Sequence, residues 1–106
     1  MSLISDAGTP VISDPGQILV KSCIENQINI YPVPGASSIT ASMVVSGFDD
    51  KFIFYGFLSK KEKEVEKELS KIKNLDFSII FFIPGVKINF YIKKFRQFFI
   101  GRQIFI

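Results

Sequence analysis

Two loops of this sequence combine glycine with hydrogen-bonding side chains, a combination that can hold a polar or anionic ligand. The first reads Ser-Asp-Ala-Gly-Thr-Pro over residues 5–10, and the second reads Pro-Gly-Ala-Ser-Ser over residues 34–38. In the first loop, Gly8 would let a ligand approach the backbone, and Asp6 could accept hydrogen bonds from hydroxyl or amine groups. In the second, backbone amides and hydroxyls at a helix start could bind a carboxylate or the edge of an adenine ring.

Each loop also has a purely structural explanation. Asp6 can satisfy its own backbone in a tight turn, and Ser37 or Ser38 can cap the helix that follows. Neither loop is a GxGxxG motif or a P-loop, so the sequence gives no support for binding of a dinucleotide or a nucleoside triphosphate. Local chemistry alone favours the turn and capping explanations over ligand binding.

Composition excludes several other kinds of site. The chain of 106 residues has one cysteine, Cys23, and no histidine. A zinc site of the usual Cys/His kind, a Ser-His-Asp triad and an internal disulfide are therefore excluded. The sequence shows neither a signal peptide nor a membrane-helix pattern, so we expect a cytoplasmic protein with no membrane partner and no metal.

Strand-like and helix-like segments alternate along the chain. Strands are expected over residues 3–5, 28–33, 52–57, 77–83 and 103–106. Helices are expected over residues 15–26, 37–46, 60–73 and 88–99. This alternation predicts an α/β fold with largely parallel strand pairing. Ser59 and Glu62 match a capping box for the third helix.

Charge is unevenly divided between the two halves of the chain. Residues 1–50 carry one basic and five acidic residues, whereas residues 51–106 carry twelve basic and five acidic residues. A basic half can attract RNA phosphates, although solvated helix faces produce the same pattern. The candidate RNA-binding side chains on the polar side of the last helix are Lys87, Lys93, Lys94 and Arg96.

Together, the two loops are far more specific than either alone. Residues 3–16, Leu-Ile-Ser-Asp-Ala-Gly-Thr-Pro-Val-Ile-Ser-Asp-Pro-Gly, closely resemble the signature of the ribosomal RNA small-subunit methyltransferase I family, which belongs to the tetrapyrrole methylase superfamily. Residues 31–38, Tyr-Pro-Val-Pro-Gly-Ala-Ser-Ser, fall at the spacing of that family, and residues 52–58 resemble its next strand. The resemblance covers the whole chain and is strongest up to Leu58.

The resemblance implies an enzyme that uses S-adenosylmethionine to methylate the ribose 2′-hydroxyl of a cytidine in 16S ribosomal RNA. It implies a tetrapyrrole-methylase-like fold of two α/β domains with the cofactor between them. Residues 1–47 would end the N-terminal, cofactor-binding domain, and residues 48–106 would begin the C-terminal one. The cofactor-binding positions carried over are Asp6, Ala7, Gly8, Thr9, Pro34, Gly35 and Ser37. No catalytic residue is assigned, and the expected partner is ribosomal RNA or the small ribosomal subunit.

The chain also departs from the family pattern. The family has several strands before the position of Leu3, including a Gly-rich loop, and it continues beyond the position of Ile106. It places Tyr-Glu-Ser and a His-Arg pair where residues 82–87 read Phe-Ile-Pro-Gly-Val-Lys. These departures predict a fragment that is inactive alone, and that forms a homodimer or pairs with a missing complementary half.

Two other functions stay open. One is a methylase of the same superfamily that acts on a tetrapyrrole or another small molecule. The other is a non-catalytic remnant, or one subunit of a split gene. The Ser-Asp-Ala-Gly-Thr-Pro run favours the RNA branch, because the tetrapyrrole branch usually has Gly-Gly-Asp-Pro there.

Overall fold

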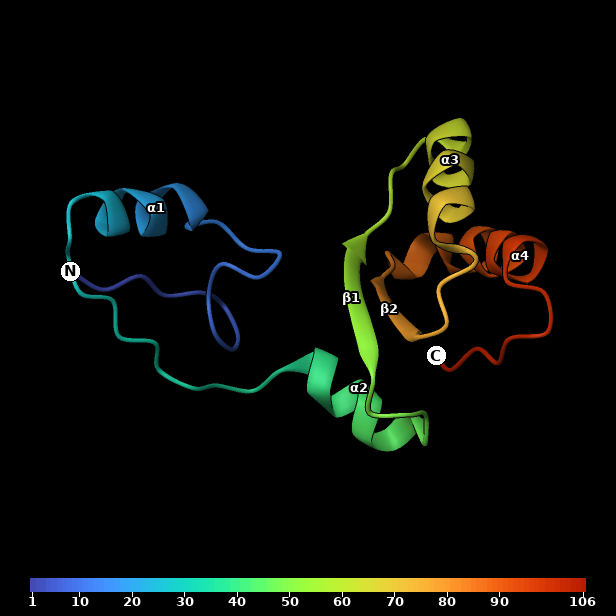
Figure 1. Ribbon diagram of the computed structural model, residues 1–106, viewed down its shortest axis with the longest axis horizontal. Coiled ribbons are helices and arrows are strands. Elements are labelled where there is room, and N and C mark those ends of the chain that lie inside the picture. The colour runs from blue at the N-terminus through green and yellow to red at the C-terminus, as the bar shows by residue number, and fades with distance from the viewer. The chain divides into compact units, whose positions relative to one another are not determined.

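The computed structural model describes residues 1–106, which form two compact units, Met1–Ala41 and Ser42–Ile106. The mixture of helices with a parallel sheet confirms the predicted α/β class. No helix is long enough and apolar enough to cross a membrane. The elements, in chain order, are α1 (Gln17–Glu25), α2 (Ser38–Ser46), β1 (Phe52–Phe57), α3 (Glu62–Ile72), β2 (Ser78–Phe82), the 3₁₀ turn η1 (Gly85–Lys87) and α4 (Ile88–Phe98) (Figure 1).

The first unit contains α1 and the first residues of α2, and the rest of its chain is irregular. α1 begins after Gly16, whose φ of 127° is accessible to glycine and strained for other residues. The strands expected over residues 3–5 and 28–33 do not form. An extended segment becomes a stable strand only when its N–H and C=O groups pair with a neighbouring strand. Neither segment has such a neighbour in this unit, so sequence preference alone does not produce a strand.

The second unit is built on a βαβ crossover. β1 and β2 are parallel, with Phe52 opposite Ser78 and Phe57 opposite Phe82. The register is irregular between Phe54 and Gly56, where Gly56 has a φ of 86°. α3 connects the strands, and α4 follows β2, as the alternating pattern predicts. The strand expected over residues 103–106 does not form, and it too has no partner strand.

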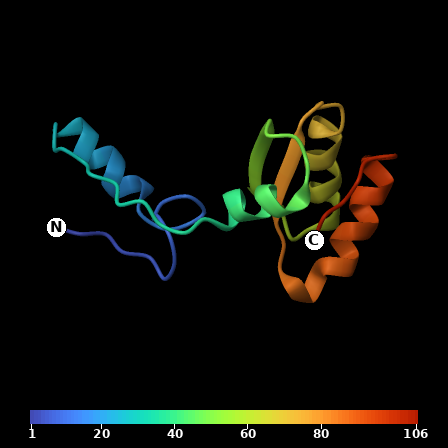
Figure 2. The same cartoon turned by 90° about the horizontal axis from the view of Figure 1, so that it is seen from below.

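The hydrophobic core lies where α3 and α4 pack on one side of the two strands (Figure 2). Val65 and Leu69 of α3 are fully buried, four residues apart on one helix face. Phe81 of β2 stacks on Phe95 of α4, with ring centroids 4.8 Å apart. The core residues are Leu58, Val65, Leu69, Tyr91, Phe95 and Phe99.

Ser59 joins the end of β1 to both helices, although not through the predicted capping box. The N-cap of α3 is Lys61, which makes no side-chain capping bond. The Ser59 hydroxyl instead donates to the Glu64 carboxylate, and its backbone N–H donates to Glu68 Oε2 at 3.1 Å. The Tyr91 hydroxyl of α4 donates to the Ser59 carbonyl at 3.0 Å. All three polar groups of Ser59 are therefore used to hold the layers together.

The opposite side of the sheet carries aromatic side chains outside the core. Phe82 contacts Phe54 and Phe57, with ring centroids 5.0 Å and 5.3 Å apart. None of the three belongs to the core or packs against it, and Phe57 is 58% exposed. Each strand also has one unpaired edge, because the sheet has only two strands.

We expect the chain to self-associate through this sheet, because unpaired edges and exposed aromatic side chains favour contact between copies. Phe57→Lys should shift the population toward monomer without disturbing the core. Val86→Lys is the matched control, since Val86 is 95% exposed and lies outside the sheet. Sedimentation velocity over a concentration series measures the effect. A monomeric unaltered chain at the highest concentration would refute the expectation.

Candidate functional site

The two loops singled out from the sequence touch each other in the first unit. A Cβ on Gly35 would lie 3.0 Å from the Cα and 3.1 Å from the carbonyl carbon of Gly8. A Cβ on Gly8 would overlap the carbonyl oxygen of Ala36. The Thr9 hydroxyl also reaches the Val33 carbonyl, at 3.5 Å. The loops approach backbone to backbone, and a side chain at Gly8 would prevent this approach, while one at Gly35 would crowd it.

The first loop is closed by Ser5 and not by Asp6. The Ser5 hydroxyl is within hydrogen-bonding distance of the carbonyls of Ala7, at 3.2 Å, and Gly8, at 3.1 Å. Gly8 has a φ of 71°, in the left-handed region that glycine adopts at little cost. Asp6 is exposed, and its carboxylate makes no hydrogen bond or ion pair. The turn explanation for Asp6 is therefore wrong, and its carboxylate is free to meet a ligand.

The second loop leads directly into α2, and Ser37 takes the capping role that the sequence left open. The Thr40 N–H approaches the Ser37 hydroxyl oxygen at 3.5 Å, and the Thr40 hydroxyl donates to the Ser37 carbonyl at 3.1 Å. Pro34 and Gly35 precede this cap and are exposed. The loop thus presents an exposed backbone immediately before a helix N-terminus, where anionic groups are favoured.

The chain between the first loop and α1 contains two unusual backbone conformations. Val11 has a φ of 84° and Ser13 a φ of 59°. A positive φ is costly for a β-branched residue such as valine. Nothing in the local sequence indicates this conformation, because valine is among the residues least expected to adopt it.

The candidate RNA-binding residues separate into an exposed set and one buried residue. Lys87, Lys93 and Arg96 are exposed, as expected. Lys94 departs from the prediction because it is buried, 7% exposed, between α3 and α4. Its Nζ lies 2.5 Å from Glu62 Oε1 and 2.6 Å from Glu66 Oε1. Lys94 therefore joins two helices and is not available to an RNA phosphate.

The hydrogen bonds of this cluster shift the ionisation of its members. The bond from Lys94 lowers the pKa of Glu62, and the adjacent positive charge adds to this effect. The bonds to Glu62 and Glu66 raise the pKa of Lys94, against the opposing effect of burial. Both shifts favour the charged forms of Glu62 and Lys94, which therefore stabilise each other as ions.

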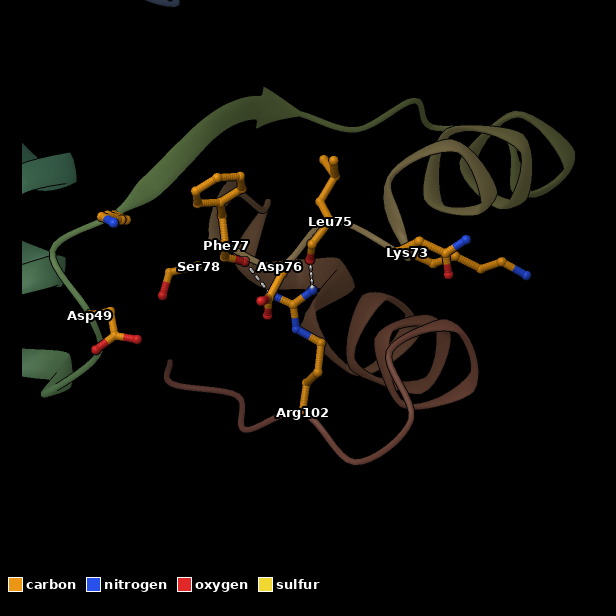
Figure 3. Close-up of a pocket in the computed structure, with 9 residues that line it drawn as sticks. Asp49, Lys73, Leu75, Asp76, Phe77, Ser78 and Arg102 are labelled. Carbon is orange, nitrogen blue, oxygen red and sulfur yellow. Dashed lines mark hydrogen bonds between the residues drawn. The ribbon is translucent and has the colours of Figure 1, made fainter.

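A pocket of about 560 Å³ lies near the beginning of the two strands, and sequence reasoning did not identify it (Figure 3). Arg102 donates to the Leu75 carbonyl at 2.8 Å and to the Phe77 carbonyl, and its guanidinium lies 5.3 Å from the ring centroid of Phe99. Open α/β sheets bind ligands at the opposite, C-terminal ends of their strands. We assign Arg102 a structural role, in which it attaches the chain after α4 to the loop before β2.

Comparison with known proteins identifies the relatives of this sequence. No protein-family model matches it. Curated proteins named ribosomal RNA small subunit methyltransferase I do match. The protein of Leptospira biflexa is 47% identical over 83 residues, which cover 77% of this chain and 35% of the relative. That of Mesomycoplasma conjunctivae is 39% identical over 102 residues, covering 96% and 42%. That of Thermotoga maritima is 37% identical over 107 residues, covering 100% and 48%.

These matches confirm the resemblance expected from the loop motifs. The matched part includes most or all of this chain, so the similarity is not confined to one short motif. The chain spans between a third and a half of the length of these curated relatives.

The ion cluster around Lys94 predicts a specific dependence of stability on pH. Because the pKa of Glu62 is lowered in the folded chain, its contribution is present above the ordinary Glu value of about 4.3 and is lost as pH falls through the lowered value. Because the pKa of Lys94 is raised, its contribution is present below about 10.4 and is lost as pH rises through the raised value.

Lys94→Met should remove both parts of this pH dependence, since neither carboxylate then has a cation. Lys67→Met is the control, because Lys67 lies exposed on α3 and forms no ion pair. The measurement is the free energy of urea unfolding at acid, neutral and alkaline pH. An unchanged pH profile in Lys94→Met would contradict this account of the cluster.

Proposed function

We propose that this chain, a homologue of the ribosomal RNA small subunit methyltransferase I proteins, forms part of a methyltransferase that uses S-adenosylmethionine and acts on ribosomal RNA. The similarity to those proteins supports the reaction class. The contact between Gly8 and Gly35 carries the assignment of the site, because it unites the two loops. We propose the ribose 2′-hydroxyl of a cytidine as the methyl acceptor.

The residues of the two loops suit such a ligand. The free Asp6 carboxylate can accept hydrogen bonds from the amine or the ribose hydroxyls of S-adenosylmethionine. The backbone at Gly8 and Gly35 has no side chain to keep a ligand away, and Ala7 and Thr9 complete the first loop. Pro34 and Ser37 flank the exposed backbone before α2. When bound, S-adenosylmethionine supplies a methyl group on a positively charged sulfur.

Methyl transfer also requires the acceptor oxygen to be held in line with the methyl group. Such positioning can supply roughly 7–11 kcal/mol of the barrier in well-oriented reactions. The loops named here would form one wall of that site, and we propose that segments corresponding to the unmatched part of the relatives form the other. We assign no catalytic base within this chain, because it contains no histidine and the carboxylate of the first loop, Asp6, is proposed to hold the cofactor.

The exposed basic residues of η1 and α4 would meet the RNA. The residues proposed to bind RNA are Lys87, Lys93 and Arg96. Lys94 is not included, because its ammonium group is ion-paired with Glu62 and Glu66. Contacts of this kind neutralise phosphates and are largely independent of sequence.

The site assignment predicts weak binding of S-adenosylmethionine that depends on the loop contact. Gly8→Ala should abolish it, because the new Cβ meets Ala36 and the left-handed backbone costs about 1–2 kcal/mol for other residues. Gly47→Ala is the matched control, since Gly47 has a φ of 67° but no neighbouring atom. Asp6→Ala should also weaken binding, whereas Asp14→Ala should not. Calorimetric titration measures each affinity, and equal affinities for Gly8→Ala and Gly47→Ala would refute the site.

The reaction itself is tested with labelled S-adenosylmethionine and undermodified small ribosomal subunits. We expect no transfer by the chain alone, and transfer to a cytidine ribose when the unmatched segments of the Thermotoga maritima relative are added as separate polypeptides. Transfer by the chain alone, at rates like those of the intact relative, would refute the proposal of an incomplete site. No transfer under either condition would favour a non-catalytic chain.

If the exposed basic residues of η1 and α4 bind RNA, the affinity of the chain for RNA should decrease steeply with salt. Neutralising Lys87, Lys93 and Arg96 together should lower the slope of log affinity against log salt by about one unit for each lost phosphate contact. Lys94→Met should leave the slope unchanged, because Lys94 is buried in its ion pairs. Fluorescence anisotropy with a small-subunit RNA fragment measures the slope. A slope that is the same in all variants would exclude this surface.

A further inference from the structure

We propose that Ser5 is a positioning residue that sets the shape of the first loop and thereby prepares it to receive the methyl donor. The inference rests on the proposed function for the identity of the ligand. Ser5 is not among the residues proposed to touch the ligand, so its role is to shape the loop. The relevant observation is that the Ser5 hydroxyl lies 3.2 Å from the Ala7 carbonyl and 3.1 Å from the Gly8 carbonyl.

Ser5 is the side chain best placed to fix this loop. Among the first ten residues, only Ser5 and Pro10 are not exposed. Asp6 makes no bond within the loop, and the one other side-chain bond, from Thr9, is longer and leads to Val33 in the second loop. The hydroxyl of Ser5 is thus the one side-chain group that ties the first loop to itself.

The conformation of Gly8 explains why the loop needs such a bond. Glycine loses more conformational freedom on ordering than any other residue, so a free Gly8 would visit many conformations besides the observed φ of 71°. In the observed conformation, the backbone of Gly8 lies directly against Gly35. Ser5 holds the carbonyl of Gly8 itself, and so restricts the residue on which the contact between the loops depends.

A fixed loop binds more tightly because less ordering is required when the ligand arrives. Replacing Ser5 by alanine removes the single hydroxyl proton that the Ala7 and Gly8 carbonyls share, and with it this restriction. The loss of one ordinary hydrogen bond corresponds to about a fivefold weaker affinity. Threonine keeps the hydroxyl, so it should retain the affinity.

The test compares Ser5→Ala, Ser5→Thr and the control Ser2→Ala, all in the full chain. Ser2 is exposed and makes no side-chain bond. The first measurement is the amide NMR spectrum of the free chain. We expect the resonances of Gly8 and Gly35 to shift or broaden in Ser5→Ala, and to stay near their original positions in Ser5→Thr and Ser2→Ala.

The second measurement is titration with S-adenosylmethionine, in which Ser5→Ala should bind about fivefold more weakly and Ser5→Thr as well as the unaltered chain. Unchanged Gly8 and Gly35 resonances in Ser5→Ala, or a Ser5→Thr variant as defective as Ser5→Ala, would overturn the role of Ser5. If the unaltered chain shows no response to S-adenosylmethionine, the proposed function fails, and the spectra of the free chain still decide whether Ser5 shapes the loop.

Discussion

Parallel pairing of β1 and β2 is the constraint on which the second unit depends. Two parallel strands cannot be joined by a tight turn, so the chain must cross over between them, here through α3. The crossing helix brings Val65 and Leu69 over the sheet, where α4 covers them with Tyr91 and Phe95. Full burial of a residue such as Val65 or Leu69 is worth about 1.5–3 kcal/mol. The core therefore follows from the topology, and the polar contacts are arranged around it.

The ion cluster and Ser59 add orientation to this core. Glu62 is 63% exposed in its side chain, so water and salt screen its pairing with Lys94. Glu62 and Glu66 of α3 nevertheless share the Lys94 cation of α4, and this shared contact favours one register between the two helices. Ser59 has a similar effect at the end of β1, because each of its polar groups meets a different side chain. Hydrophobic burial supplies the stability, and these contacts select the arrangement.

Local sequence signals predicted the helices and the paired strands of this chain well. Val65 and Leu69 show the spacing of a buried helix face, and residues 52–57 have the composition of a strand. The expected strands at residues 3–5, 28–33 and 103–106 do not form, because a strand depends on a partner that its own residues do not specify. Lys94 had the position of an exposed helix residue, and only the placement of α3 beside α4 buries it.

The candidate site shows the same division between local and long-range information. Gly8 and Gly35 were found from their motifs, but their contact joins segments that no local rule connects. The role of Ser5 was missed because a serine near a turn has many possible partners in sequence, and only coordinates show which carbonyls it meets. The residue types of the first loop did indicate a candidate site, since a loop that contains a carboxylate and a glycine is suited to a polar ligand.

The first unit differs from the second in how its order is maintained. α1 has no buried residue, so this unit gains little from hydrophobic burial. Its loops are held by backbone contact between glycines and by a few single hydrogen bonds. A ligand that bound both loops would add free energy only to the ordered form and would shift the unit toward that form. Part of the binding free energy would then be spent on ordering the chain, so the affinity for the methyl donor is expected to be lower than its direct contacts alone would give.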